Sequence, residues 1–582
     1  MAADAPPSEP LGALLARVRS WADDDPSPST ASELHGLATA AEAGDQDAED
    51  RLRDLFRGAL EFGTAGLRGA LGPGPDRMNL AVVRRAAAGV AAWVAARDVP
   101  PAVAIGRDAR HGSERFVEEA AAVLGGAGLQ VHVLPAPVPT PVLAYATRHM
   151  DVGAGLMVTA SHNPAADNGC KIYDDEGRQV AEADATAIAR AMDAAGRLSD
   201  LPLAAASDPR RHQVGPEIVD AYLAATRRTV LGPARPRTPV EVAYTALHGV
   251  GSPVVRQAAR ASGFITLHEV EAQAAADPDF PTVAFPNPEE PGALDLLLAH
   301  AAYVGADVAV ANDPDADRLA LAVWDRSAGE RSDPGAWRVL GGDQLGWLLA
   351  DHLVRRGGLP ADGLVATTIV SSTLLRDLAR EAGLAYAETL TGFKWLSRAP
   401  GDGQPLVLAY EEALGYCVGD LLRDKDGIGA LLLAAELVSD LLAEGRTAFD
   451  ALDHIARRHG VHATGQWSAR LEGADGAARI VAAMARLRST PPATVGGRRV
   501  ASVTDLAAGA PSRGLPPADV VGLALEGARV VVRPSGTEPK LKCYVEVVEP
   551  VAEGADVAAV RARAHEGLAG LLAAVPDALG LA

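Results

Sequence analysis

The chain has 582 residues, of which 48% are hydrophobic and 22% are charged, a balance typical of folded globular proteins and not of disordered chains. A single hydrophobic core does not extend over this length, so we expect several domains. The 54 basic and 75 acidic residues give a net charge of −21, which excludes bulk attraction to nucleic acid or to anionic membranes. An anionic small substrate therefore requires positive charge that is concentrated locally.

The cysteines and the N-terminal residues bear on where the protein resides. Cys170, Cys417 and Cys543 lie far apart and form no C-x-x-C pair, which indicates reduced thiols and not a disulfide framework or a zinc site. The first residues, "MAADAPPSEP", lack the apolar segment of a signal peptide, and no run of eighteen uncharged apolar residues follows. We therefore expect a cytoplasmic protein with no nucleic-acid or membrane partner.

Along the chain, helix signals come first and strand and helix signals then alternate. Apolar residues recur at helical spacing through residues 10–60. Apolar runs predict strands at 102–106, 131–134, 156–160, 240–246, 306–312, 319–324, 364–370 and 405–410. Helices are predicted between them, for example at 113–128 and 371–383. This alternation predicts an α/β protein with repeated units.

The C-terminal part differs, because residues 528–549 predict two strands around a turn and a long alanine-rich helix follows. Segments rich in Gly, Pro or charge at 201–211, 324–336 and 456–466 suggest the boundaries between domains. We expect three similar α/β domains with mixed sheets and a C-terminal α+β domain. The expected domains span residues 1–208, 209–328, 329–460 and 461–582.

Three aspartates, Asp313, Asp315 and Asp317, alternate along a loop between two apolar strands. Positions two apart in an extended loop point to the same side, and like charges held together favour a bound cation. Carboxylate oxygens suit magnesium or calcium. An EF-hand is excluded, because Arg318 and Trp324 stand where that motif needs glycine and glutamate. A solvated acidic turn is the structural alternative.

The segment "VTASHNPAADNGCK" (158–171) places Ser161, His162 and Lys171 just after a buried strand. A serine hydrolase is poorly supported, because the serine and histidine are adjacent and the G-x-S-x-G turn is absent. Ser161 could cap a helix as a purely structural residue. Near a magnesium site, a serine on a loop could instead accept a phosphoryl group.

Several loops have the composition of anion sites. Residues 531–542 set a guanidinium, two hydroxyls and a glycine around a turn, at Arg533, Ser535, Gly536 and Thr537. An ordinary hairpin is the alternative reading. Residues 61–72 place Arg68 among glycines, and residues 105–116 add Arg107 and Arg110. No P-loop and no complete G-x-G-x-x-G motif follows a strand, so a nucleotide-binding fold is unsupported.

Two further loops offer polar groups suited to a small substrate. Residues 389–397 carry Lys394 between two aromatic residues, and residues 409–420 carry Glu411 and Glu412 after a strand. Carboxylates on a loop accept hydrogen bonds from sugar hydroxyls in a fixed geometry. An acidic helix start explains the glutamates equally well when this loop is read alone.

The ordered motifs "TASHNP", "DPDADR", "EEALG" and "RPSGTEPK" resemble those of the α-D-phosphohexomutase superfamily, which includes phosphoglucomutases and phosphomannomutases. The resemblance extends from about residue 15 to the end of the chain, and "GTAGLRG" and "TGFKW" are most similar to the phosphoglucomutase-2-like branch. It implies four domains in a heart-shaped arrangement, each of which contributes a loop to a central cleft.

The resemblance also implies roles for individual residues. Ser161 matches the serine that carries the phosphoryl group, and it joins Asp313, Asp315 and Asp317 as ligands of one Mg²⁺ per chain. The matched catalytic groups are His162, Lys171, Arg68 and Lys394, without a decision on which is the general base. The matched substrate-binding positions are Glu411, Ala413, Arg318, Arg533, Ser535, Gly536 and Thr537.

The activity implied is the interconversion of α-D-glucose 1-phosphate and glucose 6-phosphate through a phosphoserine and a bisphosphate, with glucose 1,6-bisphosphate as activator. A monomer or weak homodimer is expected. Many hexose-specific relatives carry a hydroxyl residue at the place of Ala413, so phosphopentomutase and phosphomannomutase activities stay open. From other classes, an aspartyl-phosphate phosphatase using the "DPDAD" loop and a non-catalytic sugar-phosphate sensor are the alternatives.

Overall fold

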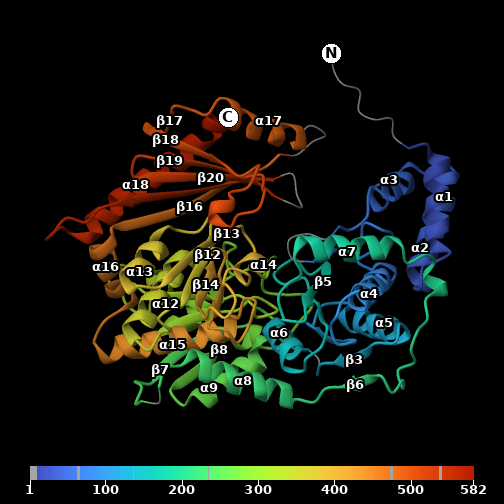
Figure 1. Cartoon of the computed structure of the whole chain (residues 1–582), viewed down its shortest axis with the longest axis horizontal. Coiled ribbons are helices and arrows are strands. Elements are labelled where there is room, and N and C mark those ends of the chain that lie inside the picture. The colour runs from blue at the N-terminus through green and yellow to red at the C-terminus, as the bar shows by residue number, and fades with distance from the viewer. Residues whose placement is uncertain are drawn as a thin grey trace.

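The computed structural model describes residues 9–61, 66–135, 137–233, 235–471, 476–535 and 540–581. Four β-sheets follow one another along the chain, each covered by its own helices, and Figure 1 shows them arranged around the middle of the molecule. Within these ranges, no helix is both long enough and apolar enough to cross a membrane.

Three helices precede the first sheet: α1 (Leu11–Ala22), α2 (Pro28–Glu42) and α3 (Gln46–Leu55). They enclose a small core of their own that includes Leu14, Leu34 and Leu52. Asp45 caps α3 by accepting a hydrogen bond from the Ala48 N–H. The three-helix unit packs at the edge of the molecule beside α4 (Leu80–Ala95), as Figure 1 shows.

The first sheet has six strands in the order β1-β5-β4-β2-β3-β6. The strands are β1 (Leu67–Ala70), β2 (Ala102–Arg107), β3 (Gln130–Val133), β4 (Ala154–Val158), β5 (Asp167–Asp174) and β6 (Arg211–Gln213). Its remaining helices are α5 (Ser113–Gly126), α6 (Thr140–His149) and α7 (Glu182–Asp193). The edge strand β6 lies a few residues beyond the boundary expected after residue 208.

The second sheet has the order β11-β10-β9-β7-β8 and the third has the order β13-β12-β14-β15. Their strands are β7 (Val240–Thr245), β8 (Ile265–Glu269), β9 (Val308–Ala311), β10 (Ala320–Trp324), β11 (Trp337–Val339), β12 (Leu364–Thr368), β13 (Ala385–Thr389), β14 (Leu406–Glu411) and β15 (Gly415–Val418). The helices are α8 (Glu217–Val230), α9 (Gly251–Ser262), α10 (Glu271–Ala274), α11 (Asp295–Val304), α12 (Gly342–Arg356), α13 (Leu374–Ala382), α14 (Phe393–Leu396), α15 (Gly427–Ala443) and α16 (Ala448–His459).

The first three sheets share one topology, which positions the site. In each, parallel strands are followed by a strand that returns antiparallel: β5 on β4, β10 on β9 and β15 on β14. The connection between the last parallel strand and the returning strand therefore leaves the sheet at the same edge each time. These three connections are called the serine loop (residues 159–166), the aspartate loop (residues 312–319) and the glutamate loop (residues 412–414).

The fourth sheet is antiparallel throughout, with six strands in the order β16-β21-β20-β19-β18-β17. They are β16 (Val461–Arg470), β17 (Thr494–Val495), β18 (Arg498–Asp505), β19 (Val521–Leu525), β20 (Ala528–Pro534) and β21 (Lys540–Glu549), with helices α17 (Gly476–Ser489) and α18 (Val557–Leu579). The two strands predicted at 528–549 are β20 and β21, and the other four escaped prediction. The expected fold class, three mixed α/β sheets and a C-terminal α+β unit, is confirmed.

The hydrophobic cores show which units are packed against one another. One core runs from the α6 side of the first sheet through the second and third sheets. The fourth sheet has a separate core beneath α17 and α18. It contacts the third sheet through a small apolar cluster that includes Ile369 and Val531, and through polar contacts at the N-terminal end of α13. The fourth sheet is therefore the least firmly attached of the four.

Candidate active site

Each of the three connecting loops contains one non-glycine residue in the left-handed backbone region. The φ angles are +51° at Ser161, +56° at Ala316 and +63° at Leu414. Such conformations cost of order 1–3 kcal/mol each and persist only where the surroundings hold them. One such residue occurs in the corresponding loop of each of the three sheets. This repetition indicates that the strained conformations are kept for function and not for stability.

Arg110 holds the serine loop in shape. Its guanidinium, 1% exposed, donates hydrogen bonds to the carbonyl oxygens of Ser161 (2.7 Å), Asn163 (2.5 Å), Pro164 (2.6 Å) and Asp167 (3.1 Å). The sequence pattern had grouped Arg110 with candidate anion-binding residues. Because its donors are directed to backbone oxygens of the loop, Arg110 is a structural residue here.

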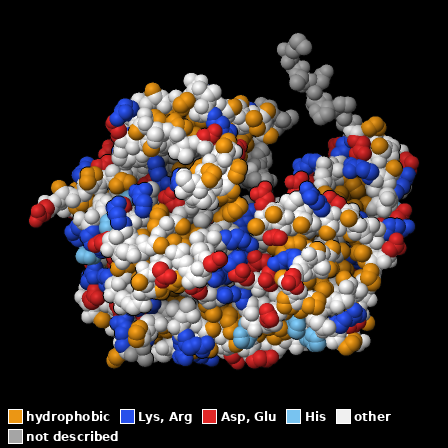
Figure 2. Space-filling model, in the orientation of Figure 1, with side chains coloured by type: hydrophobic (Ala, Val, Ile, Leu, Met, Phe, Trp, Pro, Cys, Tyr) orange, Lys and Arg blue, Asp and Glu red, His pale blue; other side chains and the backbone are white. Residues whose placement is uncertain are grey.

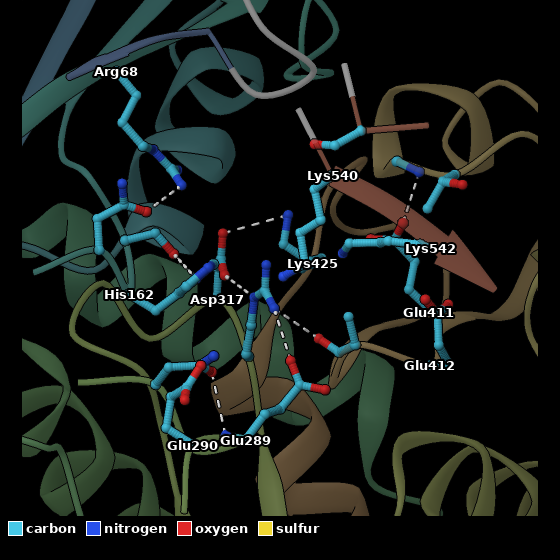
Figure 3. Close-up of a pocket in the computed structure, with 18 of the residues that line it drawn as sticks. Arg68, His162, Glu289, Glu290, Asp317, Glu411, Glu412, Lys425, Lys540 and Lys542 are labelled. Atoms are coloured by element: carbon cyan, nitrogen blue, oxygen red, sulfur yellow. Dashed lines mark hydrogen bonds and ion pairs between the residues drawn. The ribbon is translucent and has the colours of Figure 1, made fainter. Parts of the chain in front are cut away.

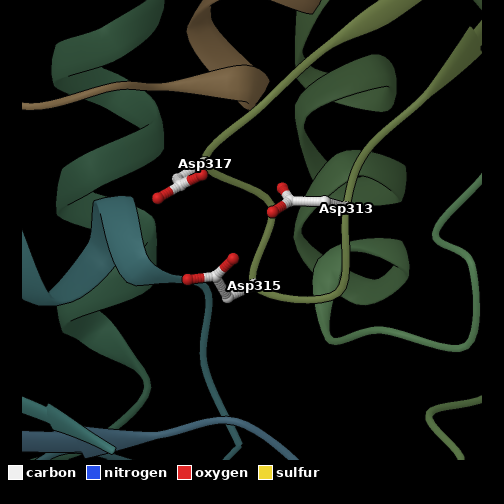
Figure 4. A group of neighbouring side chains, drawn as sticks. All are labelled: Asp313, Asp315 and Asp317. Atoms are coloured by element: carbon white, nitrogen blue, oxygen red, sulfur yellow. The ribbon is translucent and has the colours of Figure 1, made fainter. Parts of the chain in front are cut away.

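The aspartate loop forms a compact oxygen site (Figure 4). Asp313, Asp315 and Asp317 are fully buried, and one carboxylate oxygen of each lies within 4.8 Å of the others. Asp315 Oδ1 and Asp317 Oδ1 have no hydrogen-bond partner among the described residues. Buried carboxylate oxygens without partners are costly unless a cation is present. The residues therefore fit a hard divalent cation such as Mg²⁺.

Ser161 and the aspartate loop meet directly, although 152 positions separate them in the chain. Ser161 Oγ donates a 2.7 Å hydrogen bond to Asp313 Oδ2. Burial and the negative charges of Asp315 and Asp317 raise the pKa of Asp313. On the other side of the loop, Thr140 at the start of α6 donates to Asp315 Oδ2 over 2.6 Å. The first two sheets thus share this centre.

Two buried lysines balance part of this negative charge. Lys171 Nζ lies 2.6 Å from both Asp315 Oδ2 and Asp317 Oδ2. Although burial disfavours its charged form, the two carboxylates raise the pKa of Lys171. Lys425 Nζ lies 3.4 Å from Asp317 Oδ2 and 3.2 Å from Asp424 Oδ1. Both ammonium groups are therefore charged at neutral pH.

His162 and Arg68 complete this end of the site. His162 Nδ1 lies 3.2 Å from Ser161 Oγ. Burial and the neighbouring Arg318 and Arg68 hold the pKa of His162 well below its usual value, so the imidazole is neutral at pH 7. Arg68 lies on β1, an edge strand of the first sheet, and donates a 2.9 Å hydrogen bond to Asn163 Oδ1.

A cleft of about 900 Å³ lies between the four sheets and opens onto these groups. Figure 2 shows basic and acidic side chains side by side near the middle of this face. One end of the cleft carries Arg68, His162 and Lys171, and Figure 3 shows Lys540 and Lys542 across it. The rest of the lining includes four glutamates, Glu289, Glu290, Glu411 and Glu412, together with Arg318 and Lys425. The cleft thus suits a molecule that is anionic at both ends and rich in hydroxyls between them.

The predicted site residues are mostly gathered at this cleft. Those that line it are Arg68, Ser161, His162, Lys171, Asp317, Arg318, Glu411, Ala413, Arg533 and Ser535. Asp313 and Asp315 are fully buried beside it. Lys394 is not among the lining residues; its ammonium lies 5.8 Å from the ring centre of Trp395, and partial burial lowers its pKa. Gly536 and Thr537 lie outside the described residues.

Contacts among the substrate-side residues tie the loops together. Arg318 Nη1 donates a 3.0 Å hydrogen bond to the Ala413 carbonyl oxygen, which joins the aspartate loop to the glutamate loop. Glu411 Oε1 accepts one from the backbone N–H of Gly392 over 2.7 Å. Arg533 Nη1 donates to Thr391 Oγ1 over 2.5 Å, linking the fourth sheet to the third.

Sequence reasoning missed several charged groups of the cleft, among them Glu289, Lys425 and Lys542. Glu289 stands in the proline-rich segment "FPNPEEP", and Lys425 in "RDKDG" just before α15. Charged residues clustered between a strand and a helix were the available signal for Lys425. Lys542 lies on β21, where it faces the cleft because strand residues alternate between faces.

Comparison with known proteins gives a consistent result over most of the chain. Four family profiles match in order: phosphoglucomutase/phosphomannomutase alpha/beta/alpha domain I over residues 59–198, domain II over 220–326, domain III over 341–458 and the C-terminal domain over 475–564. A "Probable phosphomannomutase" of Haemophilus influenzae is 39% identical over 477 residues, covering 81% of this chain and 93% of that protein. A "Phosphoglucomutase" of Staphylococcus haemolyticus is 32% identical, covering 84% and 91%.

Solved structures share the fold. A "putative phosphomannomutase" from Thermus thermophilus superposes with a TM-score of 0.63 at 23% identity, covering 88% of this chain and 99% of that one. A phosphoglucomutase from Paramecium, titled pp63/parafusin in its open form, superposes with a TM-score of 0.65 at 16% identity, covering 89% and 95%. At these identities the likeness is one of fold.

Proposed function

Because the chain belongs to the phosphoglucomutase/phosphomannomutase family and is a phosphohexomutase, we propose that it interconverts α-D-glucose 1-phosphate and glucose 6-phosphate. The observation that carries the proposal is the hydrogen bond from Ser161 Oγ to Asp313 at one end of a cleft whose other end is basic. A serine held against a cation site and facing a cleft for a doubly anionic molecule is suited to carry a phosphoryl group.

In the proposed cycle, phosphorylated Ser161 transfers its phosphoryl group to the free hydroxyl of the sugar phosphate. The bond between phosphorus and Oγ breaks, a bond to the sugar oxygen forms, and the hydroxyl proton passes to a side chain of the site. His162, whose imidazole is neutral and lies 3.2 Å from Ser161 Oγ, can accept that proton directly, whereas Lys171 can do so only after it has lost its own proton. The bisphosphate then turns within the cleft and returns its other phosphoryl group to Ser161 Oγ.

The protein's own groups supply the binding needed for this cycle. Arg533, Ser535 and Lys542 bind the phosphate that does not react, and Glu411 accepts hydrogen bonds from sugar hydroxyls. Asp313, Asp315 and Asp317 would hold Mg²⁺, with the phosphoserine as a further ligand. When bound, Mg²⁺ stabilises negative charge on the transferred phosphoryl oxygens.

Two features of the proposal go beyond what membership of the family shows. We take glucose 1,6-bisphosphate as the activator that first phosphorylates Ser161, and the protein as a monomer or weak homodimer. Phosphomannomutase activity is the second candidate, supported by the absence of a hydroxyl at Ala413 and by the name of the Haemophilus influenzae relative.

Phosphorus NMR tests the proposal. Purified protein is mixed with Mg²⁺, α-glucose 1-phosphate and a trace of glucose 1,6-bisphosphate, and a growing glucose 6-phosphate signal is expected. Ser161→Ala abolishes the conversion in the same assay, whereas Ser29→Ala, at an exposed serine of α2, retains it. Free phosphate as the main product favours the aspartyl-phosphate phosphatase. An unchanged spectrum with glucose 1-phosphate but conversion of mannose 1-phosphate favours the second candidate.

A further inference from the structure

The glutamates that line the cleft differ in the hydrogen bonds that their carboxylates already accept. Glu412 accepts hydrogen bonds from Ser371 Oγ and Thr368 Oγ1, so it is bound to the third sheet. Glu411 accepts one from a backbone N–H. Glu289, on the loop between α10 and α11, accepts no side-chain hydrogen bond from any residue that the structure describes. Its side chain is 42% exposed and lines the cleft.

Arg318 places the Glu289 carboxylate beside the glutamate loop. Arg318 Nη1 lies 3.6 Å from Glu289 Oε2, and the same nitrogen donates a hydrogen bond to the Ala413 carbonyl oxygen over 3.0 Å. Figure 3 shows Glu289 and Glu290 at one side of the pocket and Glu411 and Glu412 at another. Arg318 therefore links the Glu289 carboxylate to the backbone of Ala413, the position where the sequence lacks a hydroxyl residue.

The loop that carries Glu289 is held by its own backbone. Pro286 and Pro288 are buried, and their rings restrict φ. The Glu289 N–H donates to Asn287 Oδ1 over 3.2 Å, and the Glu290 N–H donates to the Asn287 carbonyl oxygen over 3.0 Å. A carboxylate presented by such a loop loses little conformational freedom when it binds a ligand.

We propose that Glu289 is a specificity-determining substrate residue, whose carboxylate accepts hydrogen bonds from ring hydroxyls of the phosphosugar. It supplies from the second sheet a contact that Ala413 does not supply from the third, and Arg318 keeps it in place. This inference rests on the proposed function. An epimer whose hydroxyl points elsewhere leaves this carboxylate unpaired, so Glu289 discriminates between sugars.

Steady-state kinetics of Glu289→Gln with glucose 1-phosphate and mannose 1-phosphate tests the inference. Glutamine keeps the size of the side chain but removes the charge and one acceptor oxygen. Loss of a charge-assisted hydrogen bond predicts a rise in KM for the preferred sugar of about tenfold, with kcat changed less than about threefold. The ratio of kcat/KM between the two sugars moves toward one. Glu289→Asp, which keeps the carboxylate, partly restores that ratio.

Glu271→Gln, at an exposed position on α10, is the matched control and retains both constants. An unchanged KM and an unchanged sugar ratio in Glu289→Gln overturn the inference. A fall in kcat with KM unchanged also overturns it, because Glu289 then acts only through Arg318. Both outcomes leave the proposed function standing, since wild-type turnover is measured in the same series. Wild-type protein that converts neither sugar refutes the proposed function itself.

Discussion

Glu546 on β21 is a buried polar attachment between the fourth sheet and the third. Its side chain is 3% exposed, and its carboxylate accepts hydrogen bonds from Ser372 Oγ (2.5 Å) and the Thr373 N–H (3.0 Å) at the beginning of α13. Within the fourth sheet, His462 Nδ1 lies 2.8 Å away and Arg529 Nε donates over 2.6 Å. We predict that Glu546→Gln destabilises the strands of the fourth sheet that surround it, β20 and β21, as well as their contact with α13.

The size of the effect follows from the pKa of this carboxyl. Although burial alone would raise it, the hydrogen bond from His462 and the charge of Arg529 lower the pKa of Glu546 from 4.5 to about 2. That difference corresponds to about 3 kcal/mol of stability. Because the folded-state pKa is the lower one, this stability is complete above about pH 5 and is lost as the pH falls from about 4.5 toward 2.

Hydrogen exchange at pH 7, followed by mass spectrometry, measures the opening of the fourth sheet in the full chain. A multi-domain protein need not unfold in one step, so local opening is the suitable quantity. Glu546→Gln is expected to lower the opening free energy of β20 and β21 by about 3 kcal/mol. Glu549→Gln, a partly exposed position on the same strand, is the control. The difference between wild type and Glu546→Gln should also shrink below pH 4. Equal protection of β20 and β21 in Glu546→Gln and in Glu549→Gln would refute the reasoning.

Three further substitutions test the construction of the site. Arg110→Lys removes most of the buried donors to the serine-loop carbonyls, so kcat should fall at least about tenfold and the melting temperature should fall as well. Wild-type kcat would contradict this. Gly427→Ala places a methyl group 2.3 Å from the Arg318 carbonyl oxygen, so the aspartate loop should shift. Isothermal titration calorimetry should then show weaker Mg²⁺ binding, and wild-type affinity would contradict this prediction. Tyr222→Phe deletes a buried 2.6 Å hydrogen bond to Asp426, the cap of α15. The opening free energy of α15 in hydrogen exchange should fall by about 1–2 kcal/mol with kcat retained, and unchanged protection would disprove that.

Much of the fold and of the candidate site was predictable from local pattern. Short apolar runs such as 156–160 and 364–370 predicted strands because each is buried on both faces. The serine, aspartate and glutamate motifs follow three such runs directly. A residue that follows a buried strand is confined to a loop at the edge of the sheet, so its general place is set by its neighbours in sequence.

Other features depended on contacts between distant segments. Strand β18 is exposed along most of its length and so has no alternating apolar pattern to identify it. Arg110 resembled an anion-binding residue in the sequence, and only its four carbonyl partners distinguish it as a support of the serine loop. The position of the Glu289 carboxylate in the cleft depends on its contact with Arg318, and no local sequence pattern connects these two residues.

The sequence by itself determined the residue types of the candidate site, their order and their position after buried strands. Only the tertiary structure decided which of them meet, because the relative placement of the sheets depends on the packing of a core shared by segments hundreds of residues apart. Ser161 and Asp313 lie in hydrogen-bond contact across 152 residues, whereas Lys394 is not among the residues that line the cleft, although Gly392 and Phe393 before it are. Local chemistry restricts the candidates, and packing brings a subset of them together.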